Sequence, residues 1–409
     1  MKIEVQCIII QNNEITMKRF TQLEKDYVNQ VIDNEFNTSK NSIFGNKLEA
    51  AFSKVIGMEY SIAHVNGTAT MHTALAALGV KRGDEVIVPP LTMSSTALAV
   101  LQNGSIPVFA DVDEKTFNIS AKSIENCITS KTKAIITVAL YGLSPDYESI
   151  IEVCKKNNLY LIEDNAECFL SYYKGKVVGS FGDFSSFSFQ ASKHLTCGEG
   201  GMLCTNNEDF ANEGRRFSSL GYAGVSAKQG KITRNDIQDP NYSRHVSLGF
   251  NYRLSEGNAA IVLGQLERAT ELVDNRIAVA KIFDEIIDNQ TLLIKQHNPS
   301  DCINSFWCYS LYLNTDNPKV DWYKFRDLFQ KNGGDGYYAA WKLSYFEPLF
   351  LNEIQNYEGV WQKFSQGLCP VAEFLQPRMI QLKTNYWDLD EAKHQAEILR
   401  KTINEYNSI

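Results

Sequence analysis

Short apolar runs alternate with alanine-rich or amphipathic segments through the first half of the chain. The runs predict strands over residues 61–65, 85–89, 107–111, 133–139 and 159–163. The segments between them predict helices over residues 68–78, 94–102, 121–128 and 146–157. This alternation indicates βαβ units, and therefore a mostly parallel sheet that is covered by helices on both faces.

Segments of different character flank this alternation. Residues 1–20 predict a short strand or arm, and residues 20–56 predict two helices separated by a turn near 37–42. Residues 220–250 are rich in Gly, Ser, Gln, Asn and Asp and predict a long loop, which in a compact domain is usually functional or mobile. One long helix is predicted over residues 255–289.

The rest of the chain mixes a strand-like run at 307–313 with helices predicted over 322–330 and 390–406. A chain of 409 residues is long enough for two domains. We therefore predict a three-layer α/β/α large domain with a mostly parallel sheet over residues 1–270, which includes an N-terminal arm over about residues 1–30. A smaller α+β domain is predicted over residues 271–409.

The composition excludes several classes of protein. Apolar content is 44% and charged content 22%, as in ordinary globular proteins, and the net charge of −8 does not favour nucleic acid or an anionic membrane as partner. The nine cysteines show no zinc-like spacing, so no metal site is expected and a reducing cytoplasm is the simplest compartment. The N-terminal residues show no signal-like cleavage region, and no apolar run is long enough to span a membrane.

One lysine lies where a solvated surface charge is not expected. Lys193 follows an apolar run that begins at Phe184, and a glycine cluster over residues 198–201 follows it. A buried lysine amine has a lowered pKa, acts as a nucleophile and forms Schiff bases with aldehydes, among which pyridoxal phosphate (PLP) is the commonest cofactor. Because most lysines at strand ends lie on the surface, the hypothesis also needs a phosphate cradle and a carboxylate for the pyridine nitrogen.

Two segments can supply the cradle. Asn66-Gly67-Thr68 follows the first predicted strand and opens the first helix, where backbone N–H groups bind phosphate well. For this segment alone an ordinary N-cap is the simpler explanation. Ser188 lies five residues before Lys193, and its hydroxyl could reach the same phosphate or could simply pack within a strand.

The carboxylate candidate is Asp164, which ends the predicted strand at 159–163. Ligands of such sheets bind outside the carboxyl ends of the strands, and a carboxylate there can pair with a protonated pyridine nitrogen. A turn-capping or salt-bridged aspartate is the alternative. Asn251 and Arg253, just before the long helix, either serve an anion or cap and cover the surface.

Taken together in this order, these residues resemble the DegT family of sugar aminotransferases. That family belongs to the fold type I, aspartate-aminotransferase-like PLP enzymes. The similarity covers about residues 30–400 and rests on Asn66-Gly-Thr68, Asp164, Ser188-x4-Lys193, Thr196-x-Gly-Glu-Gly-Gly201 and Asn251-Tyr-Arg253-Leu-Ser-Glu256.

The resemblance implies a role for each of five residues in one subunit. Lys193 would form the Schiff base with PLP and move the proton during catalysis. Asp164 would pair with the pyridine nitrogen of the cofactor. Its phosphate would be bound by Gly67, Thr68 and Ser188.

The resemblance also implies a homodimer, and it includes three departures. Asn251 would reach the phosphate of the neighbouring subunit's cofactor. Met93 stands where an aromatic ring commonly stacks on PLP, so weaker stacking is expected. Glu167 stands where a glutamine commonly contacts the phenolic oxygen, so its carboxyl must be protonated or charge-balanced. Ala139 stands where many relatives have histidine.

The implied reaction is transfer of an amino group from glutamate or glutamine to a keto or aldehyde sugar, commonly nucleotide-linked, for a polysaccharide or antibiotic amino sugar. A free keto sugar, a sugar acid or a cyclitol is an alternative acceptor. Relatives that dehydrate sugars carry histidine in place of the lysine, so His194 keeps a PLP-dependent dehydratase open, and a non-catalytic regulator is a third alternative. Trp307 and residues 336–341 either line a sugar site or form the core of the small domain.

Overall fold

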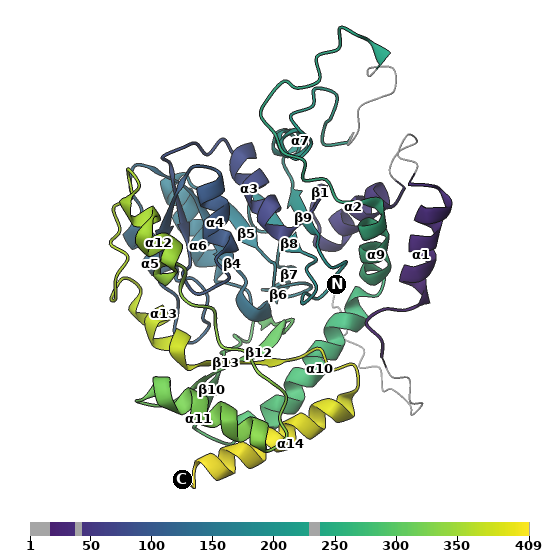
Figure 1. Cartoon of the computed structure of the whole chain (residues 1–409). Coiled ribbons are helices and arrows are strands. Elements are labelled where there is room, and N and C mark those ends of the chain that lie inside the picture. The colour runs from purple at the N-terminus through teal and green to yellow at the C-terminus, as the bar shows by residue number, and fades with distance from the viewer. Residues whose placement is uncertain (1–16, 37–42, 229–237, 409) are drawn as a thin grey trace.

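The computed structural model describes residues 17–36, 43–228 and 238–408, and a seven-stranded sheet forms its centre (Figure 1). The strands lie in the order β1-β9-β8-β5-β4-β2-β3, and β9 alone runs opposite to the other six. Their bounds are Tyr60–His64 (β1), Glu85–Val88 (β2), Ile106–Phe109 (β3), Thr132–Val138 (β4), Tyr160–Asp164 (β5), Phe184–Ser188 (β8) and Gly201–Thr205 (β9). The predicted, mostly parallel α/β sheet is confirmed, with strand bounds shifted by one or two residues.

Helices cover both faces of this sheet. One face carries α3 (Gly67–Ala77), α4 (Ser95–Gln102) and α7 (Glu208–Phe217), the last of which was not predicted. The opposite face carries α2 (Ile43–Ile56), α5 (Ala121–Cys127) and α6 (Tyr147–Asn157). Both faces of the central strands are therefore buried, which explains why these strands read as continuous apolar runs.

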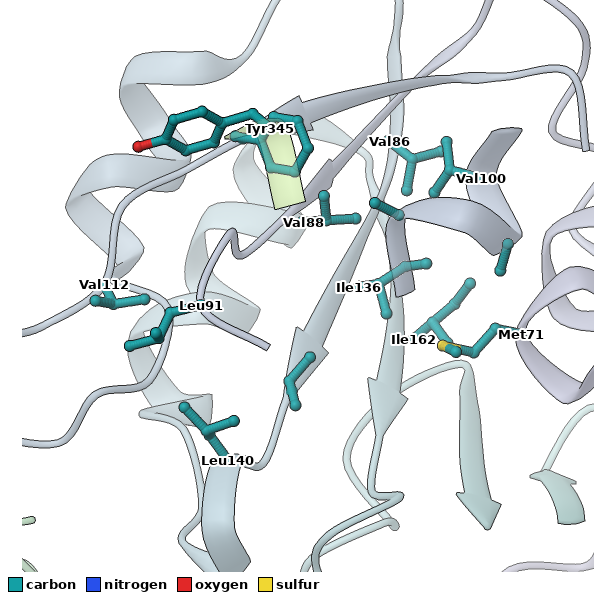
Figure 2. Packing of buried hydrophobic residues seen from close by; sticks show 14 of the residues in the cluster. Met71, Val86, Val88, Leu91, Val100, Val112, Ile136, Leu140, Ile162 and Tyr345 are labelled. Carbon is teal, nitrogen blue, oxygen red and sulfur yellow. The ribbon is translucent and has the colours of Figure 1, made fainter. Parts of the chain in front are cut away.

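The packing on the face covered by α3 and α4 shows why the alternation of apolar runs and helical segments predicted the βαβ units correctly. Met71 of α3 and Val100 of α4 lie over Val86 and Val88 of β2 and Ile162 of β5 (Figure 2), all of them at most 2% exposed. Burial of each such side chain contributes about 1.5–3 kcal/mol. The layer fixes the carboxyl ends of the strands, which is where a ligand site is expected.

The long helix predicted over residues 255–289 is wrong in one respect: it is two helices, α9 (Glu256–Leu266) and α10 (Ala269–Ile287). The break falls at Arg268, whose backbone leaves the helical region at φ −114° and ψ 14°. Its guanidinium donates to Glu24 Oε1 at 3.2 Å and to the carbonyl of Lys18 at 2.8 Å. Contacts with the segment around α1 (Gln22–Asp33) thus bend a stretch whose apolar periodicity is continuous.

A second sheet lies below the first in Figure 1 and is built from the C-terminal part of the chain. Its strands are β10 (Leu293–Lys295), β12 (Cys308–Leu313) and β13 (Met379–Lys383), in the order β10-β12-β13. They share a core with α10, α11 (Pro318–Lys331) and α14 (Leu389–Tyr406). The predicted mixture of strands and helices is therefore present here.

The remaining elements are short. A third small sheet joins β6 (Tyr172–Tyr173), β7 (Lys176–Val177) and β11 (Cys302–Ile303). Helices α12 (Pro348–Asn352) and α13 (Pro370–Leu375) pack on the large sheet, where Phe350 and Phe364 meet Phe109. Single 3-10 turns are η1 (Leu140–Gly142), η2 (Ser344–Phe346), η3 (Ile354–Asn356) and η4 (Gln376–Arg378).

Several sequence expectations fall partly outside the described residues. These include most of the predicted arm over residues 1–20 and the turn near 37–42. In the described part of 220–250, residue 238 alone is helical and no residue belongs to a strand. Tyr222 and His245 form an isolated antiparallel β-bridge across this segment. The domain boundary at residue 270 stays a prediction, and α10 spans it.

Two further findings concern the described ranges as a whole. The eight cysteines within them are free thiols. Of the helices in residues 17–36, 43–228 and 238–408, none has the length and apolar character needed to cross a membrane.

Candidate active site

A cavity of about 990 Å³ lies at the carboxyl ends of the large sheet and is bounded on its other side by residues of the β10-β12-β13 sheet and the segments beside it. Ligand pockets in proteins measure about 300–1,000 Å³, so this one has room for a cofactor together with a substrate. Seven of the eight predicted site residues line it. They are Gly67, Thr68, Met93, Asp164, Glu167, Ser188 and Lys193.

The first turn of α3 forms one end of the cavity. Asn66 caps the helix, with its Oδ1 accepting from the N–H of Ala69 at 2.8 Å. The N–H groups that precede Ala69 in this turn have no acceptor within the helix. A Cβ on Gly67 would lie 3.0 Å from the Cβ of Ser188, and one on Gly201 would lie 2.7 Å from the carbonyl of Asn66. The glycines thus create a tight concave surface with N–H groups and a hydroxyl, which suits a phosphate.

Asp164 stands at the end of β5 and is 3% exposed. Its Oδ2 accepts from Thr96 Oγ1 at 2.8 Å and its Oδ1 from the N–H of Ala166 at 3.1 Å. Burial raises the pKa of this carboxyl, while the two hydrogen bonds and the charge of Lys193 oppose the rise. A protonated pyridine nitrogen beside this carboxyl would stabilise its ionised form.

The neighbouring acid, Glu163, faces the other side of the sheet. It is fully buried and accepts from the N–H groups of Gly179, Phe181 and Gly182 at 2.6–2.8 Å. This is a structural contact that fixes the turn before β8. The alternation of side chains along a strand thus directs the two consecutive acids to opposite faces of the sheet.

The amine of Lys193 lies inside the cavity. Its side chain is 12% exposed, and its Nζ lies 3.3 Å from Oε1 of Glu167 and 4.4 Å from the centroid of a ring of Trp307. The backbone carbonyl of Lys193 accepts from Arg19 Nη2 at 2.6 Å. The amine therefore sits between a carboxylate and an indole face, and contact with bulk water is slight.

The side chain of Glu167 is buried even more completely than that of Lys193. Its side chain is 4% exposed, and its Oε2 accepts from the N–H of Tyr141 at 3.2 Å. Burial raises the pKa of this carboxyl, and the charge of Lys193 opposes the rise. Lys193 is thus the charge balance that a glutamate at this position requires.

His194 does not share the cavity with its neighbour. It is 2% exposed, and its Nε2 lies 3.1 Å from the carbonyl oxygen of Ser305. Burial lowers the pKa of its imidazole well below the ordinary value. His194 lines only a small void of about 10 Å³, which Lys193 and Asn165 also line, whereas Lys193 alone of the two neighbours lines the main cavity.

The other singled-out positions vary in their relation to the cavity. Met93 lines it and is 48% exposed, with its sulfur accepting from the N–H of Ser95 at 3.4 Å. Ala139 is buried, and its N–H donates to the carbonyl of Asp164 at 3.0 Å. Asn251 is exposed, pairs with Ser219 and is not among the lining residues of the cavity in its own chain.

Several lining residues come from the C-terminal part of the chain and were missed or left open. Trp307 stacks on Trp341 with ring centroids 5.9 Å apart and planes at 19°, and both line the cavity with Tyr338. These aromatic residues are therefore part of the site as well as of the core. Lys383 and Arg276 also line the cavity, and no motif in the sequence marked either of them.

The residues present fit PLP on three counts. A cradle at Gly67 and Ser188 fits the phosphate, the buried acid Asp164 fits the ring nitrogen, and the amine of Lys193 fits the aldehyde. All of them line the same cavity. The fit follows from their geometry and does not depend on any one of them alone.

Comparison with known proteins agrees with this geometry. Residues 19–394 match the model of a family described as the DegT/DnrJ/EryC1/StrS aminotransferase family. A GDP-perosamine synthase of Escherichia coli O157:H7 is 39% identical over 95% of this chain and 96% of its own. An aminotransferase from Psychrobacter cryohalolentis has the same fold, with a TM-score of 0.84 and 28% identity over 96% of this chain and 99% of its own. The PLP form of a putative sugar aminotransferase from Streptococcus pneumoniae has a TM-score of 0.81 at 21% identity, over 97% and 100% of the two chains.

Proposed function

Since the chain belongs to the DegT/DnrJ/EryC1/StrS aminotransferase family, whose members are PLP-dependent enzymes of amino-sugar biosynthesis, we propose that it transfers the amino group of glutamate or glutamine to a nucleotide-linked keto sugar. One observation carries the proposal. The amine of Lys193 lies in the same cavity as the buried carboxyl of Asp164 and the cradle at Gly67. The size of that cavity allows for a sugar beside the cofactor.

Each residue has a physical task in this reaction. When PLP is bound, it supplies an aldehyde that takes up the amino group and a ring that accepts electrons from the substrate carbon. Gly67, Thr68 and Ser188 hold the phosphate. Asp164, with Thr96 as its hydrogen-bond donor, holds the proton on the ring nitrogen.

Proton transfer falls to Lys193. In the half-reaction that forms the keto acid, its Nζ takes the proton from the α-carbon of the donor and would deliver it to C4′ of the cofactor. Glu167, 3.3 Å away, stabilises the cation that forms when Nζ holds this proton. In the second half-reaction the same amine moves the proton in the opposite direction, to the carbon of the new amino sugar.

A GDP-linked keto sugar is the first acceptor to test, because the 39% identical relative is named for GDP-perosamine. The stacked pair of Trp307 and Trp341 offers an aromatic face to the sugar ring. Met93 and Ala139 depart from the pattern of the family. For this reason a free keto sugar, a sugar acid and a keto cyclitol are retained as alternative acceptors.

The proposed active unit is a cytoplasmic homodimer with shared sites. Asn251 does not line its own cavity, and it lies in an exposed apolar stretch in which Leu248 is 79% and Phe250 38% exposed. Exposed apolar residues in such density suggest an interface. In the dimer, Asn251 reaches the phosphate of the partner subunit's cofactor.

A substrate screen on the enzyme in two half-reactions tests the proposal. PLP-loaded protein is incubated with glutamate or glutamine, and pyridoxamine phosphate and the keto acid are quantified. The aminated enzyme is then offered GDP-, UDP- and dTDP-linked keto sugars, free keto sugars and a keto cyclitol, with mass spectrometry of the products. Amination of a GDP-linked sugar is the expected result. Failure of every amino donor to form pyridoxamine phosphate contradicts the proposal.

A further inference from the structure

The guanidinium of Arg276 is buried without a counter-charge. Arg276 lies in the first half of α10, is 1% exposed and lines the main cavity. Its Nη1 donates to the carbonyl of Trp307 at 2.8 Å and to Thr384 Oγ1 at 3.0 Å. Its Nε and Nη2 have no hydrogen-bond partner. Within residues 17–36, 43–228 and 238–408 it forms no ion pair with any carboxylate.

The other two cations that line the cavity do have acidic partners. Lys193 pairs with Glu167 at 3.3 Å, and Lys383 pairs with Asp335 at 2.5 Å. Of the three cations that line the cavity, Arg276 is therefore the one without an acidic partner.

A second arginine near Arg276 also has a buried N–H group without a partner. The Nε of Arg19 is also buried without a partner, and its Nη2 donates to the backbone carbonyl of Lys193 at 2.6 Å. Burial, and then the charge of Arg19, lower the pKa of Arg276 to about 9. Two cations with unused N–H groups thus lie near Lys193, since Arg19 binds its backbone carbonyl and Arg276 lines the same cavity.

A role in folding accounts for only part of this arrangement. The bonds from Nη1 tie α10 to the residue before β12 and to the residue after β13, but a neutral donor of similar length would do the same. A buried unpaired charge is destabilising, and buried charges in proteins are normally paired. A planar guanidinium with two free N–H groups matches a carboxylate in geometry and charge.

We propose that Arg276 binds a carboxylate of the amino-acid donor, with Arg19 raising the local positive potential. This rests on the proposed function and adds a residue that selects the donor. The turn at Gly67 and Ser188 already form the binding site for the phosphate of the cofactor, so Arg276 binds a second anion. That anion is bound in the first half-reaction and leaves with the keto acid before the sugar enters.

Calorimetric titration of the PLP-loaded enzyme with glutarate tests the proposal without turnover, because glutarate has two carboxylates and no amino group. For Arg276→Gln we expect glutarate affinity to fall by about tenfold to a hundredfold, as for loss of a charge-assisted hydrogen bond. Arg326→Gln, at a partly exposed position on α11, is the matched control and should bind as wild type does. GDP is titrated in parallel, and its affinity should stay within about twofold in both variants.

Thermal unfolding gives a second readout. Glutarate should raise the melting temperature of the wild type and of Arg326→Gln, and should leave that of Arg276→Gln unchanged. Without glutarate, Arg276→Gln should melt no lower than the wild type, because an unpaired buried charge is removed. If Arg276→Gln does not fold, Arg276→Lys replaces it, and loss of the fork should still weaken glutarate binding.

Three results overturn the proposal: no glutarate binding by the wild type, unchanged glutarate affinity in the Arg276 variant that folds, or loss of GDP affinity instead. These results are distinguishable from failure of the proposed function. That failure would appear as absence of pyridoxamine phosphate in the wild type with every amino donor, whether or not glutarate binds.

Discussion

The Nζ of Lys193 and the Oε1 of Glu167 lie 3.3 Å apart, with side chains that are 12% and 4% exposed. A glutamate at this position pairs with the lysine, whereas the glutamine that the sequence motif leads one to expect would carry no charge. Burial raises the pKa of Glu167 above its ordinary value of 4.5, so this pair responds to pH in a range where a surface glutamate does not.

Replacing Glu167 by glutamine should remove the fall at acidic pH, the acid limb, from the pH profile of the glutamate half-reaction rate. In the wild type, protonation of Glu167 at acidic pH removes the counter-charge of Lys193, and the rate of the glutamate half-reaction should fall at a pH above 4.5. In Glu167→Gln this acid limb should be absent and the plateau rate lower, by about tenfold to a hundredfold. Single-turnover rates between pH 5 and 9 check this. An acid limb that persists unchanged in the variant would assign it to another group.

Asp164 should make the apoprotein less stable as pH rises. Its pKa in the folded chain is raised by burial, so the folded state holds this proton more tightly than the unfolded state. The stabilisation is complete below the ordinary pKa of the group, 3.8, and is lost as pH rises through the raised value. In Asp164→Asn the slope of unfolding free energy against pH should be less negative by up to about 1.4 kcal/mol per pH unit.

Urea denaturation of the apoprotein between pH 4 and 7 measures this slope. Asp327→Asn is the control, because the Asp327 side chain is 73% exposed and should not change the slope. Equal slopes in the wild type and Asp164→Asn would mean that burial does not perturb Asp164 as described.

Gly67→Ala should weaken cofactor binding through crowding alone. The added Cβ would lie 3.0 Å from that of Ser188, and relief of such a contact costs about 1–3 kcal/mol. The dissociation constant for PLP should therefore rise by about fivefold to a hundredfold in a titration of apoprotein. Gly336→Ala is the matched control, since a Cβ there meets open space. A Gly67→Ala variant that binds PLP as tightly as the control would show that the phosphate lies elsewhere.

Met93→Tyr should tighten PLP binding. Met93 lines the cavity at a position where the thioether provides a weaker cover for a ring than an aromatic side chain does. An aromatic pair is worth about 0.5–1.5 kcal/mol beyond burial, which corresponds to a factor of about two to ten in affinity. Met93→Leu should bind PLP about as the wild type does. If the tyrosine variant binds no better than the leucine variant, position 93 does not cover the ring.

The large sheet, and the wall of the cavity that its strand ends and α3 form, were predictable because both depend on local patterns. Apolar runs followed by small or polar residues located β5 and β8, and their ends are where Asp164 and Ser188 stand. The N-cap of α3 was readable from Asn66 for the same reason. In each case the residue and the element that positions it are close in sequence.

The other wall could not be predicted, because it depends on contacts between distant segments. Arg276 and Lys193 line one cavity only because α10 folds against the β10-β12-β13 sheet, and no local pattern in the sequence marks this. The break at Arg268 has the same origin, since its partners lie near α1. The choice between Lys193 and His194 also required the structure, because adjacent residues leave a loop in directions that the sequence does not determine.

Borohydride reduction of the PLP-loaded enzyme tests the central claim most directly. Reduction fixes the covalent link between the cofactor and the lysine that carries it, and peptide mass spectrometry identifies the residue. Our account predicts one modified peptide, with the cofactor on Lys193, and no such product in Lys193→Ala. A cofactor found on any other lysine, or the absence of a covalent link in protein that binds PLP, would contradict it.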